Sequence, residues 1–145
     1  MKINVKKLND AASLPHHGSE DAAGYDLYSI NEQPCTILPG ETEIFDTGLA
    51  FEFPQGTFGA VVSRSGLSIK RGVRVENCIG IIDADYRGPV KVALHNDSQE
   101  PQVIDPRERI AQLILMPFIP MDFNEVSELN TTDRGEGGFG STGKN

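Results

Sequence analysis

Two aspartates, Asp83 and Asp85, follow a run of apolar residues in the segment Gly80–Gly88. If the backbone there is extended, side chains two positions apart point to the same side and the carboxylates lie close together. Such a pair suits a general base or a metal ligand, because each charge favours a proton or a cation on the other. The alternative is a solvated turn at the end of a strand, since aspartate is common in turns.

A polar loop, Ser63–Ser68, combines hydroxyls with a guanidinium and a glycine directly after an apolar run. Arg64 can bind phosphate oxygens through two parallel hydrogen bonds, and Gly66 lets the backbone approach a ligand closely. The loop is therefore a candidate phosphate-binding site, with a simple polar turn as the alternative.

Two single polar residues interrupt apolar segments, Asp26 in AGYDL and Gln112 in RERIAQLI. Asp26 could reach a divalent cation through water, because magnesium sites often combine one or two carboxylates with substrate phosphates. Gln112 needs hydrogen-bond partners if it is buried, and a water or a phosphate oxygen could supply them. A turn aspartate and a structural glutamine are the alternatives.

The last twelve residues, 134–145, contain five glycines. Glycine loses more backbone freedom on ordering than any other residue, so we expect a mobile segment. The segment nevertheless carries a cation, Arg134, a stacking group, Phe139, and two hydroxyls, Ser141 and Thr142. These groups suit a lid that closes over an anionic, aromatic ligand, whereas the alternative is a solvated terminus.

The elements that must position these residues are predicted to be short strands. The chain of 145 residues fits one domain with a real core, and its apolar runs are short, β-branched and bounded by turn residues. This pattern is typical of an antiparallel sandwich, a jelly roll or a small barrel, with at most a turn of helix at Ser68–Arg71. The predicted strands are Ile3–Leu8, Tyr25–Ser29, Thr36–Leu38, Glu43–Phe53, Phe58–Ser63, Val73–Ile82, Val90–Asn96 and Ile110–Phe118.

Composition argues against several classes of function. The net charge is −8 and the sequence pI is about 4.8, so we expect no nucleic-acid partner, because binding to a phosphate backbone requires a basic face. The three histidines and two cysteines form no zinc-binding pattern, and the cysteines are typical of thiols in a reducing compartment. With no long apolar run, we expect a soluble cytoplasmic protein with no membrane partner.

Taken together and in order, five segments resemble the five motifs of the trimeric deoxyuridine triphosphatase (dUTPase) family. The segments are AGYDL, SRSGLS, GIIDADYRG, RERIAQLI and RGEGGFGSTG, and the resemblance runs from about Val5 to Gly143. It implies an all-β, jelly-roll-like or distorted β-barrel subunit that assembles as a homotrimer. The β domain would span residues 1–133, and a flexible arm, residues 134–145, would reach over a site built by other subunits.

The same resemblance implies an activity. The enzyme would hydrolyse dUTP to dUMP and pyrophosphate with Mg²⁺, which keeps uracil out of DNA and supplies dUMP for dTMP synthesis. Asp83 resembles the general base that activates the attacking water, and Asp26 resembles the aspartate linked to the metal through water. Gln112 resembles the glutamine that contacts the α-phosphate. The phosphate-binding loop corresponds to Arg64, Ser65 and Gly66, with Ser65 near the bond that breaks.

The resemblance also assigns the nucleoside contacts. Asn77 resembles a residue of the hairpin that receives uracil, together with the backbone of Gly80, Ile81 and Ile82. Tyr86 resembles the ring that packs under deoxyribose and leaves no room for a 2′-hydroxyl, and Lys91 falls at a further substrate contact. In the arm, Arg134 matches a γ-phosphate ligand, Phe139 matches the ring stacked on uracil, and the matching phosphate contacts are Gly140, Ser141 and Thr142.

Two other functions are compatible with this fold. A dCTP deaminase of the related fold would need a carboxylate placed to serve C4 of cytosine, and we do not find its motif signature. A regulatory protein-binding role could exist beside the activity, although no insertion or extra domain marks one. One departure from the family pattern is Glu136, which adds a negative charge to the arm near the expected triphosphate.

Overall fold

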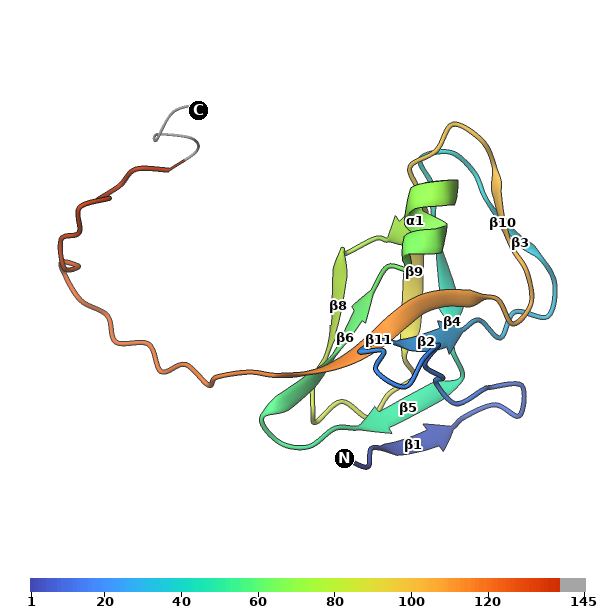
Figure 1. The fold of residues 1–145 in the computed structure, drawn as a ribbon, viewed down its shortest axis with the longest axis horizontal. Helices are drawn as coiled ribbons and strands as arrows, with labels where there is room; N and C mark the ends of the chain where they lie inside the picture. The colour runs from blue at the N-terminus through green and yellow to red at the C-terminus, as the bar shows by residue number, and fades with distance from the viewer. Residues whose placement is uncertain (139–145) are drawn as a thin grey trace.

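The chain folds almost entirely into short strands, which a computed structural model describes for residues 1–138 (Figure 1). A single helix among these residues, α1 (Ser65–Arg71), follows the sixth strand. The predicted all-β class is confirmed. The strands are β1 (Asn4–Lys7), β2 (Tyr25–Tyr28), β3 (Cys35–Ile37), β4 (Thr42–Asp46), β5 (Leu49–Glu52), β6 (Thr57–Val62), β7 (Val73–Val75), β8 (Ile79–Ile82), β9 (Lys91–Asn96), β10 (Gln102–Ile104) and β11 (Arg109–Pro117).

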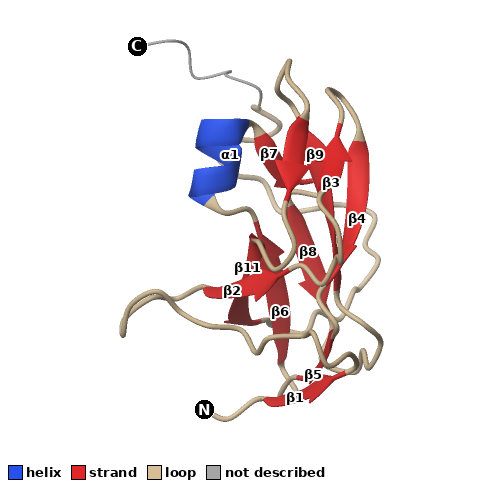
Figure 2. Cartoon of the chain, turned by 90° about the vertical axis from the view of Figure 1, so that its right-hand side faces the viewer, coloured by secondary structure: helices blue, strands red, loops and turns tan. Residues whose placement is uncertain are grey.

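Within residues 1–138 the strands pair antiparallel in four small sheets. The largest has the order β2-β11-β6-β8, a second has the order β4-β9-β7, and β1-β5 and β10-β3 form two-stranded ribbons. Figure 2 shows α1 at one end of the strands and the β1-β5 ribbon at the other. Most neighbours in these sheets are distant in sequence, so each site residue depends on pairings made across the whole chain.

One face of each large sheet packs into a shared apolar core. In the four-stranded sheet, Val61 and Leu113 are buried on the inner face, whereas Ile79 and Ile81 stand on the opposite face with more than half of their surface exposed. This alternation is what a strand with one buried face requires. The largest fully buried side chains include Leu27, Ile37, Leu49, Leu94, Ile104 and Ile110.

The predicted strand Glu43–Phe53 is wrong as a single element, because it divides into β4 and β5. Thr47 and Gly48 interrupt it, and Gly48 has a φ of 66°, a left-handed conformation that favours glycine. The Asp46 carboxylate stabilises the break by accepting a hydrogen bond from the Gly48 amide at 2.7 Å. In the sequence, Asp46, Thr47 and Gly48 separate two apolar runs, and the predicted single strand overlooked this signal.

The predicted strand Val73–Ile82 also divides, into β7 and β8. A turn separates them, in which the Cys78 amide bonds to the Val75 carbonyl at 3.1 Å and Cys78 itself has a φ of 61°. β7 pairs with β9 and β8 pairs with β6, so the chain passes from one sheet to the other here. The short strand β10 was missed, and the predicted helical turn Ser68–Arg71 starts earlier, at Ser65.

Beyond β11 the chain leaves the body of the molecule. Residues 118–138 form no helix or strand and extend away from the sheets (Figure 1). Several of their apolar side chains are strongly exposed, including Ile119 at 86%, Phe123 at 85% and Leu129 at 86%. An extended segment with this much exposed apolar surface is typical of one that docks on a partner. No helix in the described residues is long and apolar enough to cross a membrane.

Candidate active site

Asp26 holds two arginines on the outer face of the four-stranded sheet. Its carboxylate accepts a hydrogen bond from Arg64 Nε at 2.8 Å on one oxygen and from Arg109 Nη1 at 3.1 Å on the other. Asp26 is only 5% exposed, while the Arg64 side chain is 20% and the Arg109 side chain 52% exposed. We call these three residues the carboxylate–arginine cluster. It carries one net positive charge in an acidic protein, which suits an anionic ligand.

A β-bulge brings Arg109 to this face. β11 pairs with β2 so that Gln112 lies opposite Asp26 and Ala111 opposite Leu27, but Arg109 lies opposite Tyr28 because Ile110 is an extra residue. Both Ile110 and Ala111 are fully buried as a result. Without the bulge, strict alternation would direct Arg109 into the core. Sequence reasoning missed Arg109 although it quoted its motif, because a bulge leaves no clear signal in the sequence.

Gln112 and the phosphate-loop residues lie at the same end of the sheet. Gln112 is paired with Asp26 on one side and with Val62 on the other, two residues before Arg64. A Cβ added to Gly24 would lie 3.2 Å from the Gln112 side chain, so this glycine leaves room for the amide. Ser65 is exposed, and a Cβ at Gly66 would meet no atom of the chain within 4 Å. Of the predicted phosphate contacts, Arg64, Ser65, Gly66 and Gln112 are therefore grouped.

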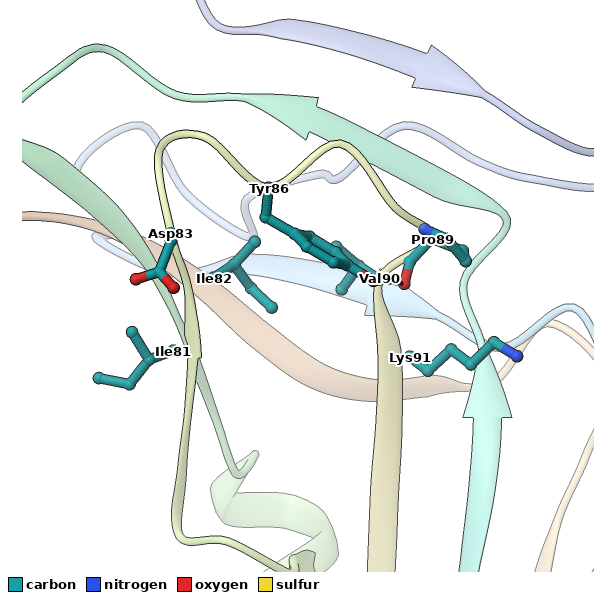
Figure 3. Close-up of a pocket in the computed structure, with 7 residues that line it drawn as sticks. All are labelled: Ile81, Ile82, Asp83, Tyr86, Pro89, Val90 and Lys91. Carbon is teal, nitrogen blue, oxygen red and sulfur yellow. Dashed lines mark hydrogen bonds between the residues drawn. The ribbon is translucent and has the colours of Figure 1, made fainter.

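A second group surrounds a cavity of about 490 Å³ between the end of β8 and the start of β9. Figure 3 shows the Tyr86 ring directed toward Pro89 and Val90 between the two arms of the loop, with Asp83 on one side and Lys91 on the other. Asp83 is exposed, and within residues 1–138 no cation forms an ion pair with it. We call this the Asp83 cavity. Its lining residues are Ile81, Ile82, Asp83, Tyr86, Pro89, Val90 and Lys91.

The two aspartates of GIIDADYRG do not stand side by side on an extended strand. The Tyr86 amide bonds to the Asp83 carbonyl at 3.1 Å, so residues 83–86 form a turn and the extended backbone required for a carboxylate pair is absent. Asp85 is exposed and is not among the cavity residues. The turn alternative is therefore correct for the backbone, and of the two aspartates only Asp83 lines the cavity.

The strand β8 leads from the β7–β8 turn to Asp83. Asn77 is exposed in that turn, and its carbonyl accepts a hydrogen bond from the Ile79 amide at 2.6 Å. β8 is the edge strand of its sheet in the described part of the chain, pairing with β6 through Gly80 to Val61 and Ile81 to Ala60. Backbone groups on the free side of an edge strand can bind a ligand.

The two groups of site residues lie at opposite ends of the β6-β8 ladder. Ile79 is opposite Val62, next to the phosphate loop, whereas Ile82 is opposite Gly59 and precedes Asp83. The four residues of β8 separate these ends by about 10 Å. Within one chain, the carboxylate–arginine cluster and the Asp83 cavity therefore lie at opposite ends of β8.

The described part of the arm, residues 134–138, makes no contact with either group within this chain. Arg134 is exposed on the arm and donates a hydrogen bond from Nε to the Gly137 carbonyl at 2.8 Å. The predicted contacts of the lid lie outside the described residues; they are Phe139, Gly140, Ser141 and Thr142.

The side chains present fit a magnesium ion that is held mainly by its substrate. Within residues 1–138 no three histidine, cysteine, aspartate or glutamate side chains are grouped as a metal site. Mg²⁺ usually keeps several waters and binds one or two carboxylates plus substrate phosphates. Both Asp26 oxygens already accept arginine bonds, but each keeps a lone pair that can accept from a water. That donor set agrees with a water-mediated contact.

Comparison with known proteins identifies the dUTPase family. The dUTPase family model matches residues 10–143. The deoxyuridine 5′-triphosphate nucleotidohydrolase of Nautilia profundicola is 48% identical over 99% of this chain and 100% of that protein, and that of Rickettsia felis is 46% identical over 98% and 97%. The solved structure of the Staphylococcus bacteriophage 80alpha dUTPase with dUPNHPP has a TM-score of 0.85 at 29% identity, covering 99% of each chain. The resemblance read from the five motifs is confirmed, and the chain belongs to the dUTPase family.

Proposed function

We propose that Asp83 activates the attacking water in the hydrolysis of dUTP to dUMP and pyrophosphate, the reaction of the family to which this chain belongs. The observation that carries the proposal is the Asp83 cavity, which an exposed carboxylate, an aromatic ring and a lysine line together. A carboxylate without a cationic partner is free to accept a proton from water. The reaction removes dUTP before it can enter DNA and supplies dUMP for dTMP synthesis.

The nucleoside would be read at β8 and at the Asp83 cavity. Amides and carbonyls on the free edge of β8, at Gly80, Ile81 and Ile82, can copy the pairing edge of adenine and so accept uracil, with Asn77 beside them. Tyr86 would support deoxyribose, and Lys91 would contact the substrate from the start of β9. A site built to pair with polar groups rejects a mismatched base strongly, by roughly 10⁴ in favourable cases.

The triphosphate would bind the carboxylate–arginine cluster and the neighbouring loop. Arg64, Ser65 and Gly66 offer a guanidinium, a hydroxyl and an open backbone, and Gln112 adds an amide for the α-phosphate. Arg109 adds a cation that the sequence-based assignment did not include. Mg²⁺, the cofactor of the family, neutralises phosphate charge when bound, and Asp26 would contact it through water.

A homotrimer with shared sites would unite the two groups. Their separation along β8 supports a site in which one subunit supplies the Asp83 cavity and another supplies the phosphate loop. The exposed apolar side chains of residues 118–138 support docking of the arm on a neighbouring subunit. The arm, residues 134–145, would then bring Arg134 to the γ-phosphate, Phe139 to uracil, and the remaining phosphate contacts Gly140, Ser141 and Thr142.

A nucleotide panel tests the activity. We expect Mg²⁺-dependent release of pyrophosphate from dUTP, with little from dTTP, dCTP or UTP. Absence of that turnover in purified protein would exclude the proposal. The alternative deaminase is not favoured by the family match, and ammonia release from dCTP is the result that would revive it. A regulatory protein-binding role and the cytoplasmic location stay predictions.

Mixing two inactive variants tests the shared site. Asp83→Asn and Arg64→Ala damage different halves of the site, so co-refolded mixed trimers should regain part of the activity. Each variant refolded alone is the matched control and should stay inactive. A native mass measurement should give three chains. A monomer, or mixtures that remain inactive, would contradict sharing between subunits.

A further inference from the structure

We infer that Gly88 is a positioning residue for Tyr86, and that through this ring it controls how the Asp83 cavity binds the sugar. The inference rests on the proposed role of Tyr86 beneath deoxyribose. Gly88 is the last residue of the segment GIIDADYRG, but the sequence predicts no substrate contact for it. Its importance follows from what a side chain at this position would meet.

A Cβ at Gly88 would collide with the tyrosine ring. It would lie 2.4 Å from Tyr86 Oη, 2.6 Å from Cζ and 3.0 Å from Cε2. Ordinary contacts between carbon atoms are about 3.5–4.0 Å, so the ring would have to move by roughly an ångström. The ring is planar and turns about only two side-chain bonds, so it cannot yield at its tip alone as a lysine could.

The backbone does not explain the glycine. Five other described glycines have a positive φ, which favours glycine for conformational reasons, but Gly88 is not one of them. An alanine at this position would therefore be compatible with the backbone. The close approach of the Tyr86 ring remains as the physical reason for the missing side chain.

Hydrogen bonds within the loop also hold the Tyr86 ring in place. Tyr86 Oη donates to the Pro89 carbonyl at 3.2 Å, and Arg87 Nη1 donates to the Ala84 carbonyl at 2.6 Å and to the Tyr86 carbonyl at 3.1 Å. The Tyr86 amide in turn bonds to the Asp83 carbonyl at 3.1 Å. One turn with its own hydrogen bonds thus carries both Asp83 and the Tyr86 ring (Figure 3), and Gly88 leaves the space that the ring occupies.

A side chain at position 88 should displace the ring without unfolding the protein. Tyr86 is 44% exposed, so solvent offers space for the ring to move into. A displaced ring would also lose its hydrogen bond to Pro89 and would no longer define one wall of the cavity. Sugar binding and the exclusion of a 2′-hydroxyl should therefore weaken together, while the catalytic carboxylate is retained.

The test compares Gly88→Ala with Gly18→Ala, a control in an exposed loop where a Cβ meets no atom within 4 Å. Wild-type hydrolysis of dUTP is measured first, which tests the activity separately. For Gly88→Ala we expect the KM for dUTP to rise about tenfold with kcat changed much less, and the preference for dUTP over UTP to fall by a similar factor. Gly18→Ala should match the wild type.

A double-mutant cycle with Tyr86→Ala isolates the ring. Gly88→Ala should have little further effect in the Tyr86→Ala background, because there is no ring left to displace. An equal effect in both backgrounds would overturn the inference, as would a Gly88→Ala enzyme with wild-type KM and sugar preference. If Tyr86→Ala leaves both quantities unchanged while dUTP is still hydrolysed, the role of Tyr86 fails and the inference fails with it.

Discussion

The carboxylate–arginine cluster and the Asp83 cavity are built in opposite ways. The cluster joins β2, the loop before α1 and β11, and Arg64 and Arg109 lie 38 and 83 positions after Asp26 in the sequence. The Asp83 cavity is lined entirely by residues 81–91. One region exists only when distant strands have paired, whereas the other is shaped by a single loop between two strands.

The two regions differ in how strongly their geometry is tied to the stability of the fold. The cluster buries a carboxylate and uses it to fix two cations, so its geometry is tied to the stability of the sheet. The Asp83 carboxylate, the proposed general base, is exposed and contributes little to the fold, so its reactivity does not depend on a stabilising contact. Substitutions in the cluster should affect stability and activity together, and substitutions at Asp83 should affect activity only.

Asp83→Asn should give the largest effect. Loss of a general base lowers kcat by about 10²–10⁴-fold. The unfolding transition should not change, because Asp83 is exposed and the substitution leaves its backbone carbonyl, which accepts the bond from the Tyr86 amide, in place. Single-turnover kinetics measure the rate of hydrolysis. Equilibrium binding measures the affinity for dUTP, which should be retained. Asp85→Asn is the matched control, and an equal loss of kcat there would remove the distinction between the two aspartates.

Asp26→Asn should lower both stability and substrate affinity. The neutral amide replaces two charge-assisted hydrogen bonds to Arg64 and Arg109, each of the kind worth about 1.5–3 kcal/mol. We expect the free energy of unfolding to fall by about 2 kcal/mol, partly screened because Arg109 is half exposed. Chemical denaturation at fixed protein concentration and the KM for dUTP measure these effects. The exposed Asp21→Asn is the control, and an unchanged denaturation midpoint for Asp26→Asn would contradict the structural role.

Gly66→Ala should separate stability from binding within the cluster region. The position lies inside α1 and a Cβ there meets no protein atom, so alanine should stabilise the chain by about 0.5–1 kcal/mol. If a phosphate approaches this backbone, the same methyl group should raise the KM for dUTP by about tenfold. Thermal denaturation and steady-state kinetics measure both. A wild-type KM would show that no phosphate group approaches Gly66.

The sequence predicted the local region better than the long-range one. The turn residues and apolar runs identified most strands, and the order of five motifs identified Asp83 and Tyr86 as neighbours on one loop. The cluster could not be predicted in full, because Arg109 reaches Asp26 only through a bulge at Ile110. Nor does a sequence indicate that Gly88 is small because a ring lies against it.

The predicted strands Glu43–Phe53 and Val73–Ile82 are each divided into two in the structure, and they show the same limit of local sequence patterns. Gly48 and Cys78 adopt left-handed conformations directly after short polar stretches, Asp46–Thr47 and Glu76–Asn77, which the predicted strands ran across. A pattern with a period of two reports which face is buried, but it does not report where a chain leaves one sheet for another. Those corners depend on the pairing of β9 with β4 and β7, which is set by contacts across the chain.

The two cysteines offer the smallest and most local test of the comparison. Burial, and secondarily the charge of Glu43, raise the pKa of the Cys35 thiol, so less of it is the reactive thiolate near neutral pH. Cys78 is exposed in the β7–β8 turn beside Asn77. We therefore expect iodoacetamide at pH 8 to modify Cys78 before Cys35, as followed by mass spectrometry of intact and digested protein.

Protection of Cys78 by a substrate analogue tests whether the β7–β8 turn and the Asp83 cavity form one nucleoside site. If Asn77 contacts uracil, dUPNHPP with Mg²⁺ should slow the alkylation of Cys78 several-fold and leave the modification of Cys35 unchanged, because Cys35 lies in the separate β3-β10 ribbon. dTTP at the same concentration is the control. Equal slowing of both thiols would indicate a global change in the protein, and no slowing of Cys78 would place the turn outside the nucleoside site.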